Sequence, residues 1–272
     1  MKQQLHAYVG DTSKKGKGKE LDNIRGRLRA AQMQLEKVIK ERDELSNLLT
    51  DTMHESRKFS SLIFGKTEKL IKSGVYDDGV VKNIHFTCGL LSARLGFTEM
   101  ELNPEGMSNI IRQSAGVYQK FDKARYLLNN TNDYAHVRIN FQGNSNIAID
   151  AIKAFDMLPF VVLQNAVKYS PPNQNVDVVF TPHNRNIVEV SVSSFGPEVS
   201  GEEAERLFER GFRGKNSAGH DGEGIGLYLA KRLCDFHGAS INVELGKRLG
   251  YEVNGGYYRR FKILMVFENF KN

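Results

Sequence analysis

The stretch that decides the fold is D-G-E-G-I-G-L-Y-L-A-K, which begins at Asp221. Glycines recur at Gly222, Gly224 and Gly226, and an apolar helical pattern runs from the last of them to Phe236. Glycines let the backbone approach a phosphate closely, and a helix N-terminus presents N–H groups and the positive end of its dipole to an anion. The stretch therefore predicts a phosphate-binding loop followed by a helix.

Three glycines before a helix also occur in dinucleotide-binding folds. There they open the first strand–helix–strand unit of a domain. Here they lie near the end of the chain, followed only by two strands predicted over 241–244 and 261–267. Their position argues against a dinucleotide-binding fold.

A second motif, L-Q-N-A-V-K-Y-S-P at residues 163–171, lies at the end of a helix predicted over 151–169. The side-chain oxygen of Asn165 suits a hydrated Mg²⁺, and Lys168, about one turn on, can meet a phosphate. Taken alone, the motif is better explained as a polar helix end.

Two further segments lie between these motifs, namely S-F-G-P at 194–197 and L-F-E-R-G-F-R-G at 207–214. The four motifs in this order resemble the GHKL ATPases, and among them the sensor histidine kinases, over about residues 105–270. This resemblance implies that ATP and Mg²⁺ bind, with the adenine between the Asn165 helix and the Gly-Pro turn. It also implies a lid over the triphosphate from Phe208 to about His220.

The resemblance assigns metal binding to Asn165 and phosphate binding to Lys168, Arg213 and the amides around Gly224 and Gly226. The complete set of ATP-binding residues that it implies is Asn165, Lys168, Tyr169, Ser194, Gly196, Phe208, Arg213, Gly222, Gly224, Ile225, Gly226 and Leu227.

Two positions depart from the family. The family has an Asp that accepts a hydrogen bond from the adenine amino group, whereas this chain has Ser194. Hydrolytic members carry a Glu four residues before the Asn, whereas this chain has Val161. An aliphatic side chain cannot activate water, which favours a kinase over a gyrase-like or chaperone-like ATPase.

The N-terminal part has a heptad pattern that predicts a coiled coil after a loose basic lead-in over residues 1–20. Arg42 interrupts this pattern. The apolar a and d positions are Leu21, Ile24, Leu28, Ala31, Leu35, Val38, Leu45 and Leu49. Helical spacing continues to about Ser73, and a second helix is predicted over 79–103. Two such helices form an antiparallel hairpin, and two hairpins from a homodimer form a four-helix bundle.

The segment H-E-S-R, which begins at His54, resembles the start of a histidine kinase phosphoacceptor motif. His54 occupies a solvent-facing f position, and Glu55 is placed to take the ring proton. His85 on the second helix is the competing acceptor. The family usually has Thr or Asn, then Pro, where this chain has Lys58 and Phe59, so phosphatase activity by that route is not expected.

Composition limits the other possibilities. The chain has 272 residues, 40% of them hydrophobic, a formal charge of +6 and two cysteines, Cys88 and Cys234, without metal-site spacing. It shows no signal peptide and no apolar run that could span a membrane, so a cytoplasmic location is expected. Lysines 14, 15, 17 and 19 are interpreted as a solvated tail, so no nucleic acid is expected as partner.

The predicted architecture is α+β, with domains over 1–20 (lead-in), 21–104 (coiled coil and helical hairpin) and 105–272 (α/β sandwich ATPase). Further predicted elements are a helix over 107–128 and strands over 137–141, 176–180 and 187–192. The predicted function is an ATP-dependent histidine kinase that phosphorylates His54 and passes the phosphoryl group to a response regulator. The alternatives are a nucleotide-binding signalling module without kinase activity, and a GHKL serine kinase or DNA-linked ATPase with a coiled-coil arm.

Overall fold

The computed structural model describes residues 2–73, 78–102, 111–129, 137–217, 220, 222–253 and 255–268. They fall into two compact units, Met1–Asp51 and Thr52–Asn272. The first unit is the N-terminal part of helix α1 (Lys2–Ser73). The helix includes residues 2–20, for which the sequence predicts a loose lead-in, because extending a helix that already exists costs little.

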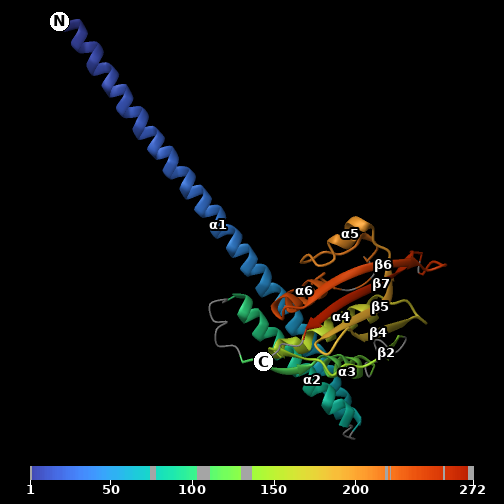
Figure 1. Cartoon of the computed structure of the whole chain (residues 1–272). Helices are drawn as coiled ribbons and strands as arrows, with labels where there is room; N and C mark the ends of the chain where they lie inside the picture. Colours follow the sequence, from blue (N-terminus) through green and yellow to red (C-terminus); the bar gives the residue numbers. More distant parts are fainter. Residues whose placement is uncertain are drawn as a thin grey trace. The chain divides into compact units, whose positions relative to one another are not determined.

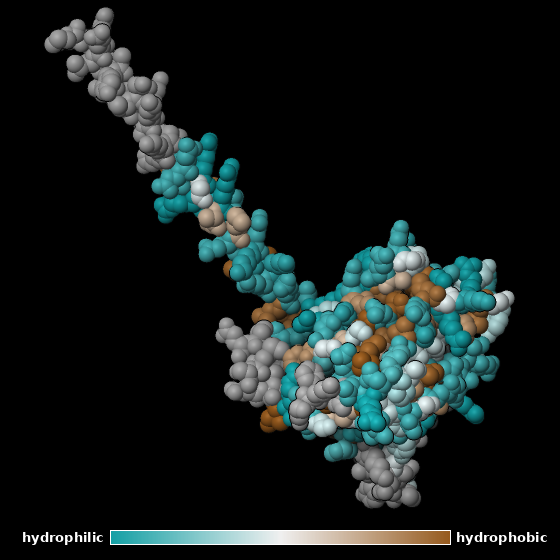
Figure 2. All heavy atoms as spheres, in the orientation of Figure 1, coloured by the Kyte–Doolittle hydropathy of each residue, from teal (hydrophilic) through white to brown (hydrophobic). Residues whose placement is uncertain are grey.

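The heptad positions of the first unit lie on the surface. The six large apolar residues among them are 54% to 60% exposed, and Figure 2 shows apolar surface between hydrophilic side chains along this helix. These residues are Ile24, Leu28, Leu35, Val38, Leu45 and Leu49. None of the helices in the described part of the chain has the length and hydropathy of a membrane span.

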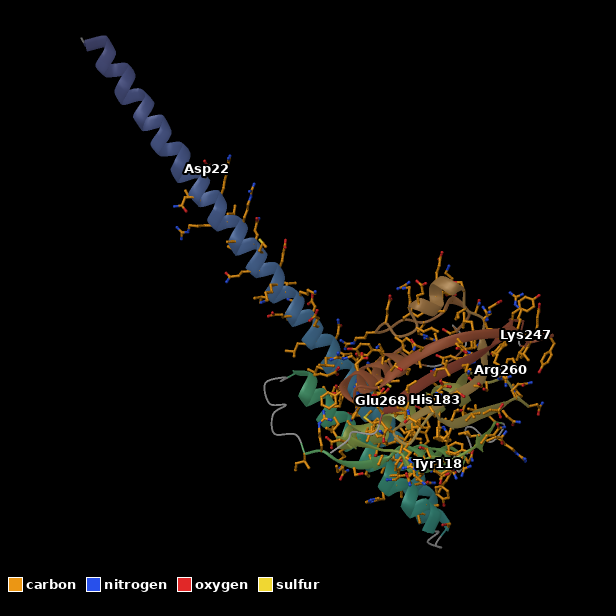
Figure 3. The ribbon with its side chains drawn as sticks, viewed as in Figure 1. Asp22, Tyr118, His183, Lys247, Arg260 and Glu268 are labelled. Carbon is orange, nitrogen blue, oxygen red and sulfur yellow. The ribbon has the colours of Figure 1, made fainter. Side chains whose placement is uncertain are left out.

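The second unit is built on a five-stranded mixed sheet in the order β2–β4–β5–β7–β6 (Figure 1). Its strands are β2 (Arg138–Gln142), β4 (Asn175–Pro182), β5 (Ile187–Pro197), β6 (Ser240–Arg248) and β7 (Tyr258–Glu268). β2 and β4 are parallel, and the other neighbours are antiparallel. Arg260 on β7, labelled in Figure 3, pairs with Asp177 of β4 at 3.4 Å and lies over the Phe195 ring of the intervening β5.

Helices α3 (Val117–Asn129), α4 (Met157–Tyr169) and α6 (Gly226–Phe236) pack together, with α4 in the middle and against β5. Every residue of α4 up to Leu163 is buried, as expected for a helix that is apolar all round. Tyr118 of α3, labelled in Figure 3, packs its ring 4.9 Å from that of Phe180 on β4. The α/β sandwich predicted for this part of the chain is therefore confirmed.

Two predicted helices are shorter than the sequence suggests. Within 107–128, residues Gln113–Gly116 form strand β1, which pairs antiparallel with β3 (Ala148–Ala151), and the helix begins only at Val117. The helix predicted over 151–169 begins at Met157, which places Pro159 in the first turn. Proline is tolerated there because the first N–H groups of a helix have no intrahelical partner.

The helical hairpin packs against helices α4 and α6 within the second unit. Helix α2 (Asp78–Leu102) meets α1 where the Thr52 hydroxyl donates to that of Thr98 at 3.0 Å. Its Phe97 contacts Phe236 of α6, with ring centroids 6.4 Å apart. This packing explains why residues 52–102 belong to the same compact unit as the sheet.

Candidate functional site

The C-terminal half of α4 turns polar where the helix reaches the cavity. Asn165, Lys168 and Tyr169 are half-buried there, after an almost fully buried first half. The Lys168 ammonium lies 2.5 Å from the point that a Cβ on Gly222 would occupy. Burial raises the pKa of Tyr169, and the charge of Arg213 opposes this effect. The helix end therefore presents an amide and a cation beside the glycine loop.

The end of β5 forms another wall of the site. β5 runs further than the predicted strand, to Pro197, so Ser194 and Gly196 are held by pairing with β7. Ser194 is 8% exposed. A Cβ on Gly196 would lie 3.2 Å from the ring of Phe261 and 3.6 Å from the Cβ of Tyr169, so a larger residue would crowd this wall.

The glycine loop is shaped by positive φ angles and by close backbone contact. Gly222 has φ 132° and Gly224 has φ 72°, values that L side chains rarely adopt. A Cβ on Gly224 would collide with the carbonyl oxygen of Phe212, and the Gly224 carbonyl accepts a hydrogen bond from Gly211 at 3.2 Å. The loop is therefore tied to the segment predicted as the lid.

Part of the predicted lid is described. It follows α5 (Gly201–Glu205), whose Ser200 and Glu203 form a capping box. Hydrogen bonds from the Lys215 and Ser200 amides lower the pKa of the Glu203 carboxyl. Arg213 donates to the carbonyls of Ser217 and His220, at 2.8 and 2.5 Å. Asp221 and residues 218–219 lie outside the described residues.

His54 lies on α1 next to the glycine loop. Its Nδ1 is 3.1 Å from Oε1 of Glu223, and the two side chains are 47% and 44% exposed. Phe59, five residues on, is 2% exposed, with its ring 6.2 Å from that of Phe160 on α4. The phenylalanine at the position where the resembled family has proline thus packs this part of α1 against α4.

These elements enclose one cavity of about 760 Å³, within the range of small-molecule sites. Most of the predicted site residues line it. They are His54, Glu55, Asn165, Lys168, Tyr169, Ser194, Gly196, Arg213, Gly222, Gly224, Ile225, Gly226 and Leu227. Phe208 does not line it but packs against the hydrophobic core, and Phe212 takes a place on the cavity wall.

Comparison with known proteins shows which family the C-terminal part of the chain resembles. The model of histidine kinase-, DNA gyrase B- and HSP90-like ATPases matches residues 160–263. This match takes in the Asn165 motif, the end of β5, the glycine loop and α6.

The relatives of this ATPase domain are named as histidine kinases. Sensor histidine kinase HprS of Escherichia coli is 23% identical over 75% of the chain and 45% of its own length. The histidine-protein kinase/phosphatase MprB of Mycolicibacterium paratuberculosis is 35% identical over 30% of the chain and 16% of its own length. The sensory kinase SasA of Gloeothece citriformis is 34% identical over 30% of the chain and 21% of its own length. The resemblance to sensor histidine kinases is confirmed, and the chain spans less than half the length of these relatives.

The residues of the ATPase site fit a magnesium nucleotide. The N-cap residue of helix α6, Ile225, supplies no side-chain acceptor to the first N–H groups of the helix, which suits an anion there. Among the described residues, no cluster of three or more His, Cys, Asp or Glu could hold a metal unaided. Mg²⁺ usually binds through one or two protein oxygens together with phosphates and water, which matches a single Asn165 oxygen in a nucleotide site.

Several residues that line the cavity were not among the predicted site residues, and Glu223 and Leu229 are two of them. Glu223 lies between two glycines assigned to the loop, and its contact with His54 joins segments far apart in the chain. Leu229 lines the cavity from the first turn of α6. The glycine motif was the only sequence signal near Glu223. It predicts the backbone conformation of the loop but not the role of the side chain between the glycines.

Proposed function

We propose that the chain is the kinase core of an ATP-dependent protein histidine kinase that phosphorylates its own His54. The observation that supports this best is that His54 and the nucleotide-binding residues line one cavity. A phosphoryl acceptor must lie within reach of the γ-phosphate, since phosphoryl transfer depends mainly on positioning and charge stabilisation.

In this reaction a ring nitrogen of His54 attacks the γ-phosphorus, the bond to the β-phosphate oxygen breaks, and ADP leaves. Asn165 would hold Mg²⁺, which supplies charge neutralisation at the phosphates. Lys168, close to Gly222, and the N–H groups at the start of α6 would bind phosphate oxygens. To bind a phosphate, Arg213 would have to give up its hydrogen bonds to the carbonyls of Ser217 and His220.

Val161 supports transfer to a protein side chain rather than to water. It lines the cavity four residues before Asn165 and is 7% exposed. A buried isopropyl group accepts no proton from water, whereas His54 offers a nitrogen nucleophile in the same cavity.

We also propose that two copies pair through the exposed heptad positions of α1. A row of apolar side chains about half exposed to water gains free energy when a second helix covers it. Two salt bridges, Lys37–Glu41 and Lys40–Glu44, lie on the same stretch of α1, each with 3.8 Å between Nζ and Oε1. The phosphoryl group would then pass to an aspartate of a response regulator.

Labelling with γ-labelled ATP tests the function. The wild-type chain should take up phosphate that is lost in acid and kept in alkali, as expected for phosphohistidine. Labelling should stop when EDTA removes Mg²⁺. Acid-stable label would favour the serine kinase. ATP binding without label would favour a nucleotide-binding signalling module, an alternative motivated by Ser194, Lys58 and Phe59.

Ser194→Asp should tighten ATP binding about fivefold. A hydrogen bond to a charged group contributes about 1.5–3 kcal/mol and a neutral one about 0.5–1.5, and a difference of about 1 kcal/mol corresponds to about fivefold in affinity. GTP should not gain, because it offers an oxo group where adenine offers an amino group. Calorimetric titration with both nucleotides measures this. Unchanged affinities for both would show that Ser194 does not face the base.

A further inference from the structure

A carboxylate inside the phosphate-binding loop requires an explanation. Glu223 stands between Gly222 and Gly224 and lines the same cavity. A negative charge there repels the triphosphate that the loop is proposed to bind. Its side chain instead contacts His54, with Oε1 3.1 Å from Nδ1. Glu223 is therefore better understood as a partner of the acceptor than as a nucleotide ligand.

The contact distinguishes the two ring nitrogens of His54. A carboxylate accepts but does not donate when ionised, so a neutral imidazole that bonds to it carries its proton on Nδ1. The lone pair then lies on Nε2, the nitrogen on the opposite side of the ring. Such a contact selects one tautomer and one ring orientation, which are the two properties that a nucleophilic imidazole needs.

Glu55 is the other carboxylate near the acceptor. It also lines the cavity, but the carboxylate oxygen that lies 3.1 Å from Nδ1 belongs to Glu223. Successive residues of a helix project about 100° apart, so neighbours i and i+1 do not face each other. Glu223, in the glycine loop, can approach the His54 ring from the side of the nucleotide. Glu55 is less well placed to do so, because it is the next residue on the same helix.

We propose that Glu223 is the positioning residue of the acceptor imidazole. It holds the Nδ1–H tautomer, and Nε2 attacks the γ-phosphorus as the bond to the β-phosphate oxygen breaks. The Nδ1 proton passes to the Glu223 carboxylate, and ADP leaves. This inference rests on the proposed kinase function. The loop that binds the phosphates would thereby also orient the group that receives one.

Nitrogen NMR of the full-length, ¹⁵N-histidine-labelled chain without nucleotide tests the contact. His54→Gln identifies the signals of His54 by their loss. The wild-type ring should be protonated at Nδ1. Glu223→Gln, whose amide oxygen still accepts a hydrogen bond, should keep this tautomer, and Glu223→Ala should lose it. Glu205→Gln, an exposed glutamate of α5 outside the cavity, should leave the signals unchanged. A tautomer that is the same in wild type and Glu223→Ala would overturn the inference.

Initial labelling rates then separate orientation from proton transfer. Glu223→Ala should lower the rate about 10-fold to 100-fold, the range for loss of a charge-assisted hydrogen bond, with ATP affinity unchanged or slightly higher. Glu223→Gln should lower it as well, since an amide cannot take the proton. Glu55→Gln should cost less than Glu223→Gln. A Glu223→Ala chain that labels as fast as wild type, or faster, would overturn the proposal. It would mean that the contact holds His54 in the nucleotide-free state and does not assist phosphoryl transfer. A wild-type chain without label would defeat the kinase function, while the NMR result would still decide whether Glu223 orients the ring.

Discussion

His54→Gln should abolish labelling from ATP while leaving ATP affinity unchanged. Glutamine is similar in size to histidine but has no nitrogen lone pair that attacks phosphorus. The residues proposed to bind the nucleotide come from α4, β5 and the glycine loop, whereas His54 lies on α1 and is 47% exposed. The substitution should therefore affect phosphoryl acceptance without affecting ATP binding. Labelling followed by electrophoresis measures acceptance, and calorimetry measures binding.

His85→Gln is the matched control for this prediction. His85 is an exposed histidine on α2 that does not line the cavity. Its replacement should leave labelling at the wild-type rate. Label that persists in His54→Gln and disappears in His85→Gln would move the acceptor to the second helix. Loss of ATP binding in His54→Gln would mean that the variant disturbs the site as a whole.

Local patterns predicted the elements whose structure depends on local forces. The predicted helix from Gly226 to Phe236 has the observed bounds of α6, because a glycine turn and an apolar period of 3.6 residues both specify it. β1 was missed because residues 113–116 extend only through pairing with 148–151, a contact that the local sequence does not encode. Nor could spacing show that α2 packs on α6 within one chain, since its apolar face suits any partner equally.

The sequence predicted those parts of the site that are marked by a recognisable motif. Glycines and the Asn165 segment mark where a nucleotide can bind, and the structure brings them to one cavity. Phe208 was assigned to the site with the lid motif, but its apolar ring packs against the core, where burial is more favourable. The Glu223–His54 contact joins two segments far apart in the sequence, so only the fold reveals it.

The contact also bears on which chain donates the phosphoryl group. His54 and the proposed nucleotide site share a cavity within the same unit of one chain, and Phe59 packs this part of α1 on Phe160. The burial of Phe59 opposes the separation of the acceptor helix from its own ATPase helices, because exposing an aromatic side chain costs about 1.5–3 kcal/mol. We therefore expect phosphorylation in cis, with each chain labelling its own His54.

A mixed dimer distinguishes cis from trans. One subunit would carry His54→Gln with an intact nucleotide site, and the other Asn165→Ala with an intact acceptor. Asn165→Ala removes the only amide oxygen assigned to Mg²⁺, so that subunit should not use ATP. Transfer in cis should give no label, because neither chain holds both parts. Transfer in trans should label the Asn165→Ala chain at about half the wild-type extent, because one acceptor of two remains.

Two different affinity tags, purified in sequence, would establish that the mixed dimer formed. A dimer of wild-type and His54→Gln chains is the positive control, and it should label only its wild-type subunit in cis. Each variant alone should remain unlabelled under both mechanisms. Label on the Asn165→Ala subunit of the mixed dimer would contradict the cis expectation. It would also mean that the His54–Glu223 contact within one chain is not the arrangement that transfers the phosphoryl group, because the acceptor would then have to meet the glycine loop of the other copy.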